Sequence, residues 1–139
     1  MLRFFGAVLA GFLVLGSAQG GEEPKGVKIT WHGQSFFEIR STKGTNIVTD
    51  PHLIEEYGRL VPAPKADLVL ISHPHNDHTQ IEALGNKDSK TLKVILGFQG
   101  TGLKATWNLV NETFKDVKVR SVGLYHDTVQ GMKLSLIHI

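Results

Sequence analysis

Hydrophobic and polar residues alternate along two neighbouring stretches, which predicts two paired strands near the start of the folded region. The first stretch is Val27–Trp31 and the second is Ser35–Arg40. A third strand is predicted at Asn46–Thr49, where the chain must leave in an extended conformation because Pro51 follows. Asp50 is therefore expected at a strand end.

A continuous apolar run at Asp67–Ser72 has the pattern of a strand buried on both faces. Leu92–Leu96 is predicted to be a second buried strand, and Thr79–Leu84 a short helix closed by Gly85. These elements follow the early strands in the order strand, helix, strand.

An amphipathic helix is predicted over Gly102–Phe114, because Leu103, Trp107, Val110 and Phe114 recur at helical spacing. Trp107 is expected to be a core residue. Alternation resumes at Val117–Val122 and delivers Tyr125, His126 and Asp127 beyond it. The order of elements predicts an α+β fold, with a mixed sheet and helices on one face.

The first 18 residues have the outline of a secretory signal peptide. Arg3 precedes a run of about a dozen apolar residues, and small residues follow at Gly16 and Ala18. The run is short against the ~20 residues needed to span a bilayer. We expect cleavage after Ala18, export to the periplasm or medium, no stable membrane span afterwards, and a flexible polar segment over residues 19–26.

The amino-acid composition limits the class of protein, its partners and the residues that could bind a metal. The 139 residues are 41% hydrophobic and 20% charged, which is typical of one globular domain. The net charge of +2 falls to +1 without Arg3, too little to indicate nucleic acid or an anionic membrane as a partner. With no cysteine in the chain, any metal must be held by histidines and carboxylates.

The segment His73–His78 packs three histidines and one aspartate into six positions at the end of the buried run. Residues two apart in an extended chain point the same way, so His73 and His75 can face one cation. Asp77 and His78 come after the chain has turned and can face a second. These side chains favour zinc, with manganese or iron as alternatives.

Two other interpretations of this segment remain open. One is a surface loop that happens to be rich in histidine, or that takes up stray divalent ions. The other is a helix with ligands one turn apart, since His75 and His78 are three positions apart. Pro74 and the lack of a His-Glu-x-x-His pattern count against the helix.

The segment His73–His78 resembles the His-x-His-x-Asp-His signature of the metallo-β-lactamase superfamily. Trp31–Phe36 followed by Asp50-Pro51, and later Tyr125–Asp127, look like the branch that contains ascorbate-6-phosphate lactonase and related metal-dependent hydrolases. The similarity runs from about Val27 to Lys133.

This resemblance implies an αββα sandwich with two zinc ions at the complete site. It implies that His73, His75 and His126 hold one metal, while Asp77 and His78 contribute to the second. The expected reaction is hydrolysis of an ester, lactone or phosphodiester in a small-molecule substrate by a metal-bound hydroxide, with Asp77 accepting the proton of the water. A β-lactamase is the least favoured activity.

The resemblance also implies that the chain is the N-terminal part of the fold. Residues 27–133 are expected to form a partial domain, without residues for a second sheet, so that the sheet face carrying part of Leu68–Ile71 lacks its cover. The last six residues, 134–139, equal the translation of CTG TCT CTT ATA CAC ATC, a transposase adapter sequence, and are predicted to be non-native. His138 is then a poor candidate ligand.

Three further residues are candidates for the surroundings of the site. Asp50 is predicted to orient a metal-bound histidine, or else to cap a turn. His32 is predicted either to line the pocket or to be a packing residue, and Asp127 adjoins His126. The rival functional hypothesis is an exported, non-catalytic metal-binding or structural protein, and the sequence does not determine the oligomeric state.

Overall fold

The computed structural model describes residues 26–100, 105–125 and 134–138. The predicted signal peptide, His126 and Asp127 lie outside these residues, so the structure does not test those predictions. Within the described part of the chain, no helix has the length and apolar character needed to cross a membrane.

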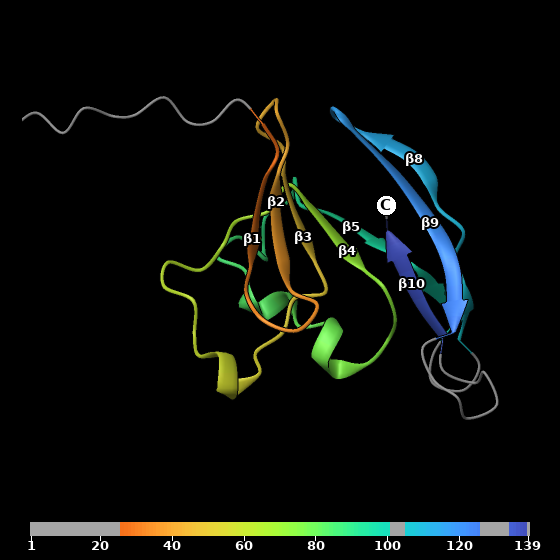
Figure 1. The fold of residues 1–139 in the computed structure, drawn as a ribbon, viewed down its shortest axis with the longest axis horizontal. Coiled ribbons are helices and arrows are strands. Elements are labelled where there is room, and N and C mark those ends of the chain that lie inside the picture. Colours follow the sequence, from red (N-terminus) through yellow and green to blue (C-terminus); the bar gives the residue numbers. More distant parts are fainter. Residues whose placement is uncertain (1–25, 101–104, 126–133, 139) are drawn as a thin grey trace, which may run out of the picture.

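A five-stranded mixed sheet forms the first layer, in the order β1-β2-β3-β4-β5 (Figure 1). Its first three strands are antiparallel, whereas β3, β4 and β5 are parallel. The bounds are β1 Lys28–Trp31, β2 Phe37–Arg40, β3 Asn46–Thr49, β4 Leu68–Ile71 and β5 Lys93–Leu96. The predicted mixed sheet and α+β class are confirmed.

Strand β4 is the centre of the molecule, and all four of its residues are buried. Leu68 and Leu70 face one apolar cluster, and Val69 and Ile71 face another on the opposite side of the sheet. The prediction of a strand buried on both faces is therefore confirmed.

The prediction for the next strand is only partly right. In β5, Ile95 is buried, but Val94 and Leu96 are 38% and 40% exposed. Strand β5 is an edge strand in this five-stranded order, so cover from neighbouring elements reaches mainly the side that carries Ile95.

The predicted helix over Gly102–Phe114 is wrong. The described part of this segment forms β7, Thr106–Trp107, which pairs with β6, Phe98–Gln99, and then β8, Asn111–Phe114. Val110 and Phe114 are four positions apart, a spacing that places two side chains on one face of a strand as well as of a helix. The segment Asn111–Phe114 is a strand and not a helix because it pairs with β9, Val117–Tyr125.

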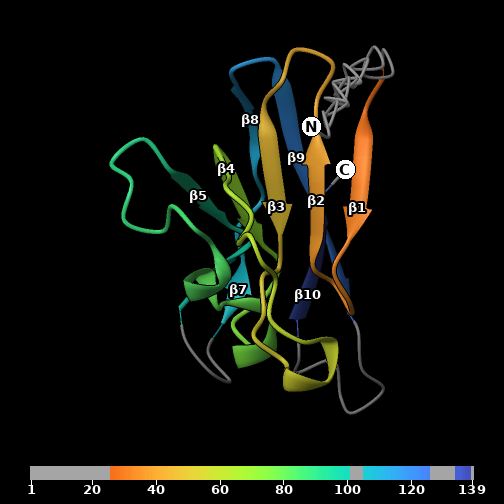
Figure 2. The same ribbon diagram turned by 90° about the vertical axis from the view of Figure 1, so that its left-hand side faces the viewer.

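A second, three-stranded sheet packs on the first. Its order is β10-β9-β8, with β9 at Val117–Tyr125 and β10 at Leu134–His138 (Figures 1 and 2). Val119 of β9 is buried in the same cluster as Leu68 and Leu70, together with the partly buried Phe114. The expectation that the chain has no residues for a second sheet is therefore wrong, and the inner face of β4 is covered.

The helical structure of the described residues consists of short 3-10 helices at the lower end of the molecule (Figure 2). They are η1 Glu55–Tyr57, η2 Asn76–His78 and η3 Ile81–Ala83. The last replaces the predicted helix Thr79–Leu84, and Ala83 and Leu84 pack on Val69 and Ile71. Cover of this sheet face by helical turns thus agrees with the predicted layering, although the described residues contain no α-helix.

Candidate metal centre

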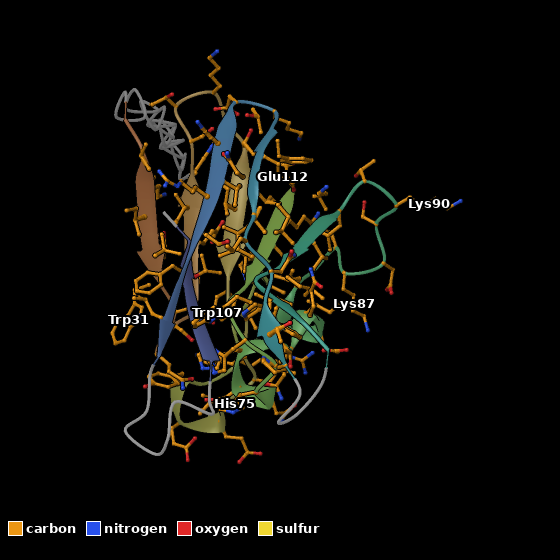
Figure 3. The ribbon with its side chains drawn as sticks, turned by 90° about the vertical axis from the view of Figure 1, so that its right-hand side faces the viewer. Trp31, His75, Lys87, Lys90, Trp107 and Glu112 are labelled. Carbon is orange, nitrogen blue, oxygen red and sulfur yellow. The ribbon has the colours of Figure 1, made fainter. Side chains whose placement is uncertain are left out.

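The segment His73–His78 leaves β4 directly, so the buried core fixes where it begins. Ser72 and His73 are buried, and η2 then turns the chain back at Asn76–His78. His75 lies at the lower end of the molecule, the end at which β9 also finishes (Figure 3). Strands β4 and β9 therefore finish toward the same end of the molecule.

Asp50 organises this segment from the end of β3. The residue is 7% exposed, and its carboxylate accepts the backbone N–H of Ser72 on Oδ1, at 2.6 Å, and the Ser72 hydroxyl on Oδ2, at 2.7 Å. The backbone of Asp50 has φ 40°, a left-handed conformation that aspartate tolerates better than most residues. This strained position directs the carboxylate toward the strand that carries the histidines.

The Ser72 hydroxyl links Asp50 to His73 by hydrogen bonds. The Ser72 hydroxyl donates its one hydrogen to Asp50, so toward His73 Nδ1, 2.9 Å away, it acts as an acceptor. The Nδ1 of His73 then carries the proton, which makes Nε2 the electron-pair donor of this ring. That Nε2 lies 3.0 Å from Nδ1 of His75.

His78 is held in a similar way. Its Nδ1 lies 3.0 Å from the Ser35 hydroxyl and 3.2 Å from Oδ2 of Asp50. Its Nε2 faces Oδ2 of Asp77 at 3.5 Å. A ring whose Nδ1 donates to a carboxylate presents Nε2 as an electron-pair donor, the usual arrangement behind metal-binding histidines.

Asp77 is the exposed member of the group, with 43% of its side chain accessible. A hydrogen bond from Gln34 Nε2, 2.7 Å long, lowers the pKa of its carboxyl, and the nearby His78 and His75 lower it further. Asp77 is therefore an anion at neutral pH and offers oxygen lone pairs to a cation.

His73 and His75 thus form one pair of possible metal ligands, and Asp77 and His78 form another. The two pairs adjoin, because the ring centroids of His73 and His78 are 3.9 Å apart. Two ligand atoms of a tetrahedral zinc, each 2.0–2.1 Å from the metal, are about 3.3–3.4 Å apart. The 3.0 Å and 3.5 Å separations within the pairs bracket this value. Histidine nitrogen and carboxylate oxygen are also the donor types zinc prefers, so the residues fit a metal.

Each pair supplies only two ligands. Among residues 26–100 and 105–125, no group of three or more histidines and carboxylates is arranged to hold a metal ion. The predicted third ligand, His126, and its neighbour Asp127 lie outside the described residues.

Two further histidines, His32 and His52, have structural surroundings. His32 contacts Glu38, with 3.2 Å between Nε2 and Oε2, and packs edge-on against Phe36. His52 is buried, accepts the N–H of Ile54 on Nδ1 and therefore donates from Nε2 to the carbonyl of Gly33, 3.0 Å away. These contacts of His32 are those of a packed side chain, and its place at the metal pocket stays a prediction.

Sequence reasoning missed the side chains of Gln34, Ser35 and Ser72. Ser72 carried a weak signal because it joins the buried strand to the first histidine. Gln34 and Ser35 lie within the segment Trp31–Phe36 that carries the family resemblance, but nothing local indicated their partners, since each lies 43 positions before the residue it contacts.

Comparison with known families identifies the class of this fold and site. A family model described as the β-lactamase superfamily domain matches residues 28–135. The chain belongs to this family, within the metallo-β-lactamase superfamily of hydrolases, as the segment His73–His78 had suggested.

Relatives from several bacteria carry the name UPF0173 metal-dependent hydrolase. The protein from Bacillus velezensis is 36% identical over 83 residues, which is 53% of this chain and 36% of the relative. That from Thermodesulfovibrio yellowstonii is 38% identical over 56 residues, covering 37% of this chain and 21% of the relative. The chain thus spans about a third or less of the length of these relatives.

A solved structure shares the fold. It is a protein from Parabacteroides distasonis described as a metal-dependent hydrolase, and it matches with a TM-score of 0.55 over 81% of this chain and 56% of its own. The sequence identity is 21%, so this likeness concerns the fold alone.

Proposed function

We propose that this chain provides the first half of a metal-dependent hydrolase site. The observation that carries the proposal is the pair of histidine nitrogens, His73 Nε2 and His75 Nδ1, facing each other at 3.0 Å behind a buried relay through Ser72 to Asp50. A relay that ends on a carboxylate fixes the tautomer of a metal-binding imidazole. Family membership supports the same assignment.

In this proposal His73 and His75 bind one metal with His126, and Asp77 and His78 contribute to a second. Zinc fits the donor set best, with manganese and iron as alternatives. Bound metal would activate water and polarise the scissile bond. Asp50 holds the imidazoles in place, and Asp77, an anion at neutral pH, is positioned to accept a proton from water.

The substrate class we propose is a small molecule with an ester, lactone or phosphodiester bond. This choice rests on the branch of the superfamily that the chain resembles, and the relatives are named only as metal-dependent hydrolases. We also propose that residues 1–18 direct export. Mass spectrometry of the protein recovered outside the cytoplasm should show an N-terminus at Gln19, and a protein that stays in the cell with Met1 intact would contradict the proposal.

Because the chain spans only part of its relatives, activity should be assayed on two proteins. One is the chain as given, and the other is the product of its genomic locus extended to the relatives' length. With zinc or manganese, we expect the extended protein to cleave bis(4-nitrophenyl) phosphate or 4-nitrophenyl esters, and the chain alone to cleave neither. Chelator and His75→Ala should each abolish turnover. A metal-loaded extended protein without hydrolytic activity would instead support a metal-binding module.

A further inference from the structure

The turn between β1 and β2 carries two side chains that reach the candidate metal centre from a distant part of the sequence. Gln34 Nε2 donates to Oδ2 of Asp77 at 2.7 Å, and the Ser35 hydroxyl contacts Nδ1 of His78 at 3.0 Å. The two residues that the turn contacts are those assigned to the second metal. Neither belongs to the pair His73 and His75.

Gln34 contacts the carboxylate oxygen of Asp77 that faces His78. Oδ2 of Asp77 is also the atom that faces Nε2 of His78 at 3.5 Å. A carboxylate accepts only, so the amide nitrogen of Gln34 must be the group that points toward it. A carboxylate oxygen has two lone pairs, and one bond from an amide leaves the other for a cation.

The turn itself is firmly held. The carbonyl of Gly33 accepts bonds from Phe36 N at 2.9 Å and from His52 Nε2 at 3.0 Å. Gly33 has φ 106°, and a Cβ there would lie 2.3 Å from Cδ1 of Tyr57, so the ring closes directly over the backbone. Gln34 follows with φ 45°, a left-handed conformation, and its carbonyl accepts Trp31 Nε1 at 3.0 Å.

A turn fixed on several sides places its side chains accurately, which a mobile loop does not. Asp77, in contrast, is partly accessible, and without a partner its carboxylate would rotate among several rotamers. We infer that Gln34 is a positioning residue that sets Asp77 for the second metal, with Ser35 supporting His78. This inference rests on the proposed function.

The sharpest variant is Gln34→Gly. Glycine adopts a positive φ without strain, so this change removes the amide and keeps the turn. A purely structural role for the Gln34 amide predicts a lower melting temperature and unchanged metal binding. A positioning role predicts the same melting temperature, but an affinity for zinc about tenfold lower in the step that depends on Asp77.

Binding should be measured on the whole chain by calorimetric titration with Zn²⁺, and by the visible absorption spectrum with Co²⁺. The matched control is Gln99→Ala, since Gln99 is another exposed glutamine whose amide bonds to Asn108. We expect Gln99→Ala to bind as the wild type does. We also expect that Gln34→Gly has no further effect once Asp77→Ala is present.

Three results would overturn the inference. Wild-type affinity in Gln34→Gly, or an equal loss with and without Asp77→Ala, would show that the glutamine does not act through Asp77 while leaving the proposed function intact. A wild-type chain that binds neither ion would overturn the proposed function together with the inference.

Discussion

Asp50 shows how one buried residue can organise a site without being a metal ligand. It joins the end of β3 to Ser72 and His78, and through Ser72 to His73. The sequence could place Asp50 at a strand end, because Pro51 follows it. It could not reveal the partners of the carboxylate, because these depend on β3 and β4 lying parallel side by side.

The first prediction concerns Asp50→Asn, which keeps the shape and tolerates the positive φ. The amide group of asparagine can accept on only one atom, so at least one of the donors from Ser72 and His78 would face another donor. We expect a loss of about 1–3 kcal/mol in the free energy of unfolding, measured by urea denaturation.

The matched control for Asp50→Asn is Asp88→Asn at an exposed position, which should change the unfolding free energy by less than about 0.5 kcal/mol. Equal stability of the two variants would contradict the role given to Asp50.

At the scale of elements, the β8–β9 turn fastens the second sheet to the first. Lys115 Nζ lies 2.7 Å from Oδ1 of Asp67, at the start of β4, and Asp116 accepts a bond from the Thr45 hydroxyl before β3. Asp67 also accepts the backbone N–H of Asn46. Polar contacts thus hold one end of the two-layer core, beyond its apolar cluster.

This contact gives the second prediction. The hydrogen bond from Lys115, followed by that from Asn46, lowers the pKa of Asp67 below its ordinary value of 3.8. A lowered pKa means that the stabilisation is present above about pH 4 and is lost as the pH falls through the lowered value. Lys115→Met should therefore cost roughly 0.2–1 kcal/mol at pH 6, since the pair is partly exposed, and less toward pH 2.

Urea midpoints of wild type and Lys115→Met between pH 2 and pH 6 would test this, with Lys118→Met, an exposed lysine of β9, as the control. A difference that stays constant over this range would show that Asp67 is not the partner.

The third prediction concerns the packing of β9 against β7. A Cβ at Gly123 would lie 2.8 Å from Cδ2 of Trp107, so alanine there must displace the indole. Gly123→Ala is expected to destabilise the chain by about 1–3 kcal/mol. Gly26→Ala, where an added Cβ meets nothing within 4 Å, should have little effect, and thermal melts of both variants measure the contrast.

The strands show which sequence patterns are sufficient to predict a secondary-structure element and which are not. The run Leu68–Ile71 predicted a buried strand because it is short, apolar at every position and flanked by the polar residues Asp67 and Ser72. The stretch that ends at Phe114 was ambiguous because Val110 and Phe114 share a face in a strand and in a helix alike. Only pairing with β9, through the whole fold, settles that choice.

At the scale of the whole molecule, the described residues form a five-stranded and a three-stranded sheet packed around β4, with a small sheet of β6 and β7 and with the His73–His78 segment at one end. The sequence predicted the first sheet, its mixed character and the segment that carries the candidate metal centre. It did not predict the second sheet: a strand was expected at Val117–Val122, within β9, but helical spacing obscured β8, and β10 falls on the six residues expected to be non-native. The partners of Gln34 and Ser35 were equally hidden, since contacts across 43 positions leave no local pattern.

The measurement that bears most directly on the central claim is a zinc titration of the whole chain, comparing wild type with His75→Ala and His32→Ala. If the His73–His78 segment binds the metal, the wild type binds zinc and His75→Ala weakens that binding at least about tenfold. His32→Ala leaves the zinc affinity unchanged, because His32 contacts Glu38 and Phe36. Equal losses in both variants, or unaltered binding in His75→Ala, would contradict a metal centre built on the His73–His78 segment.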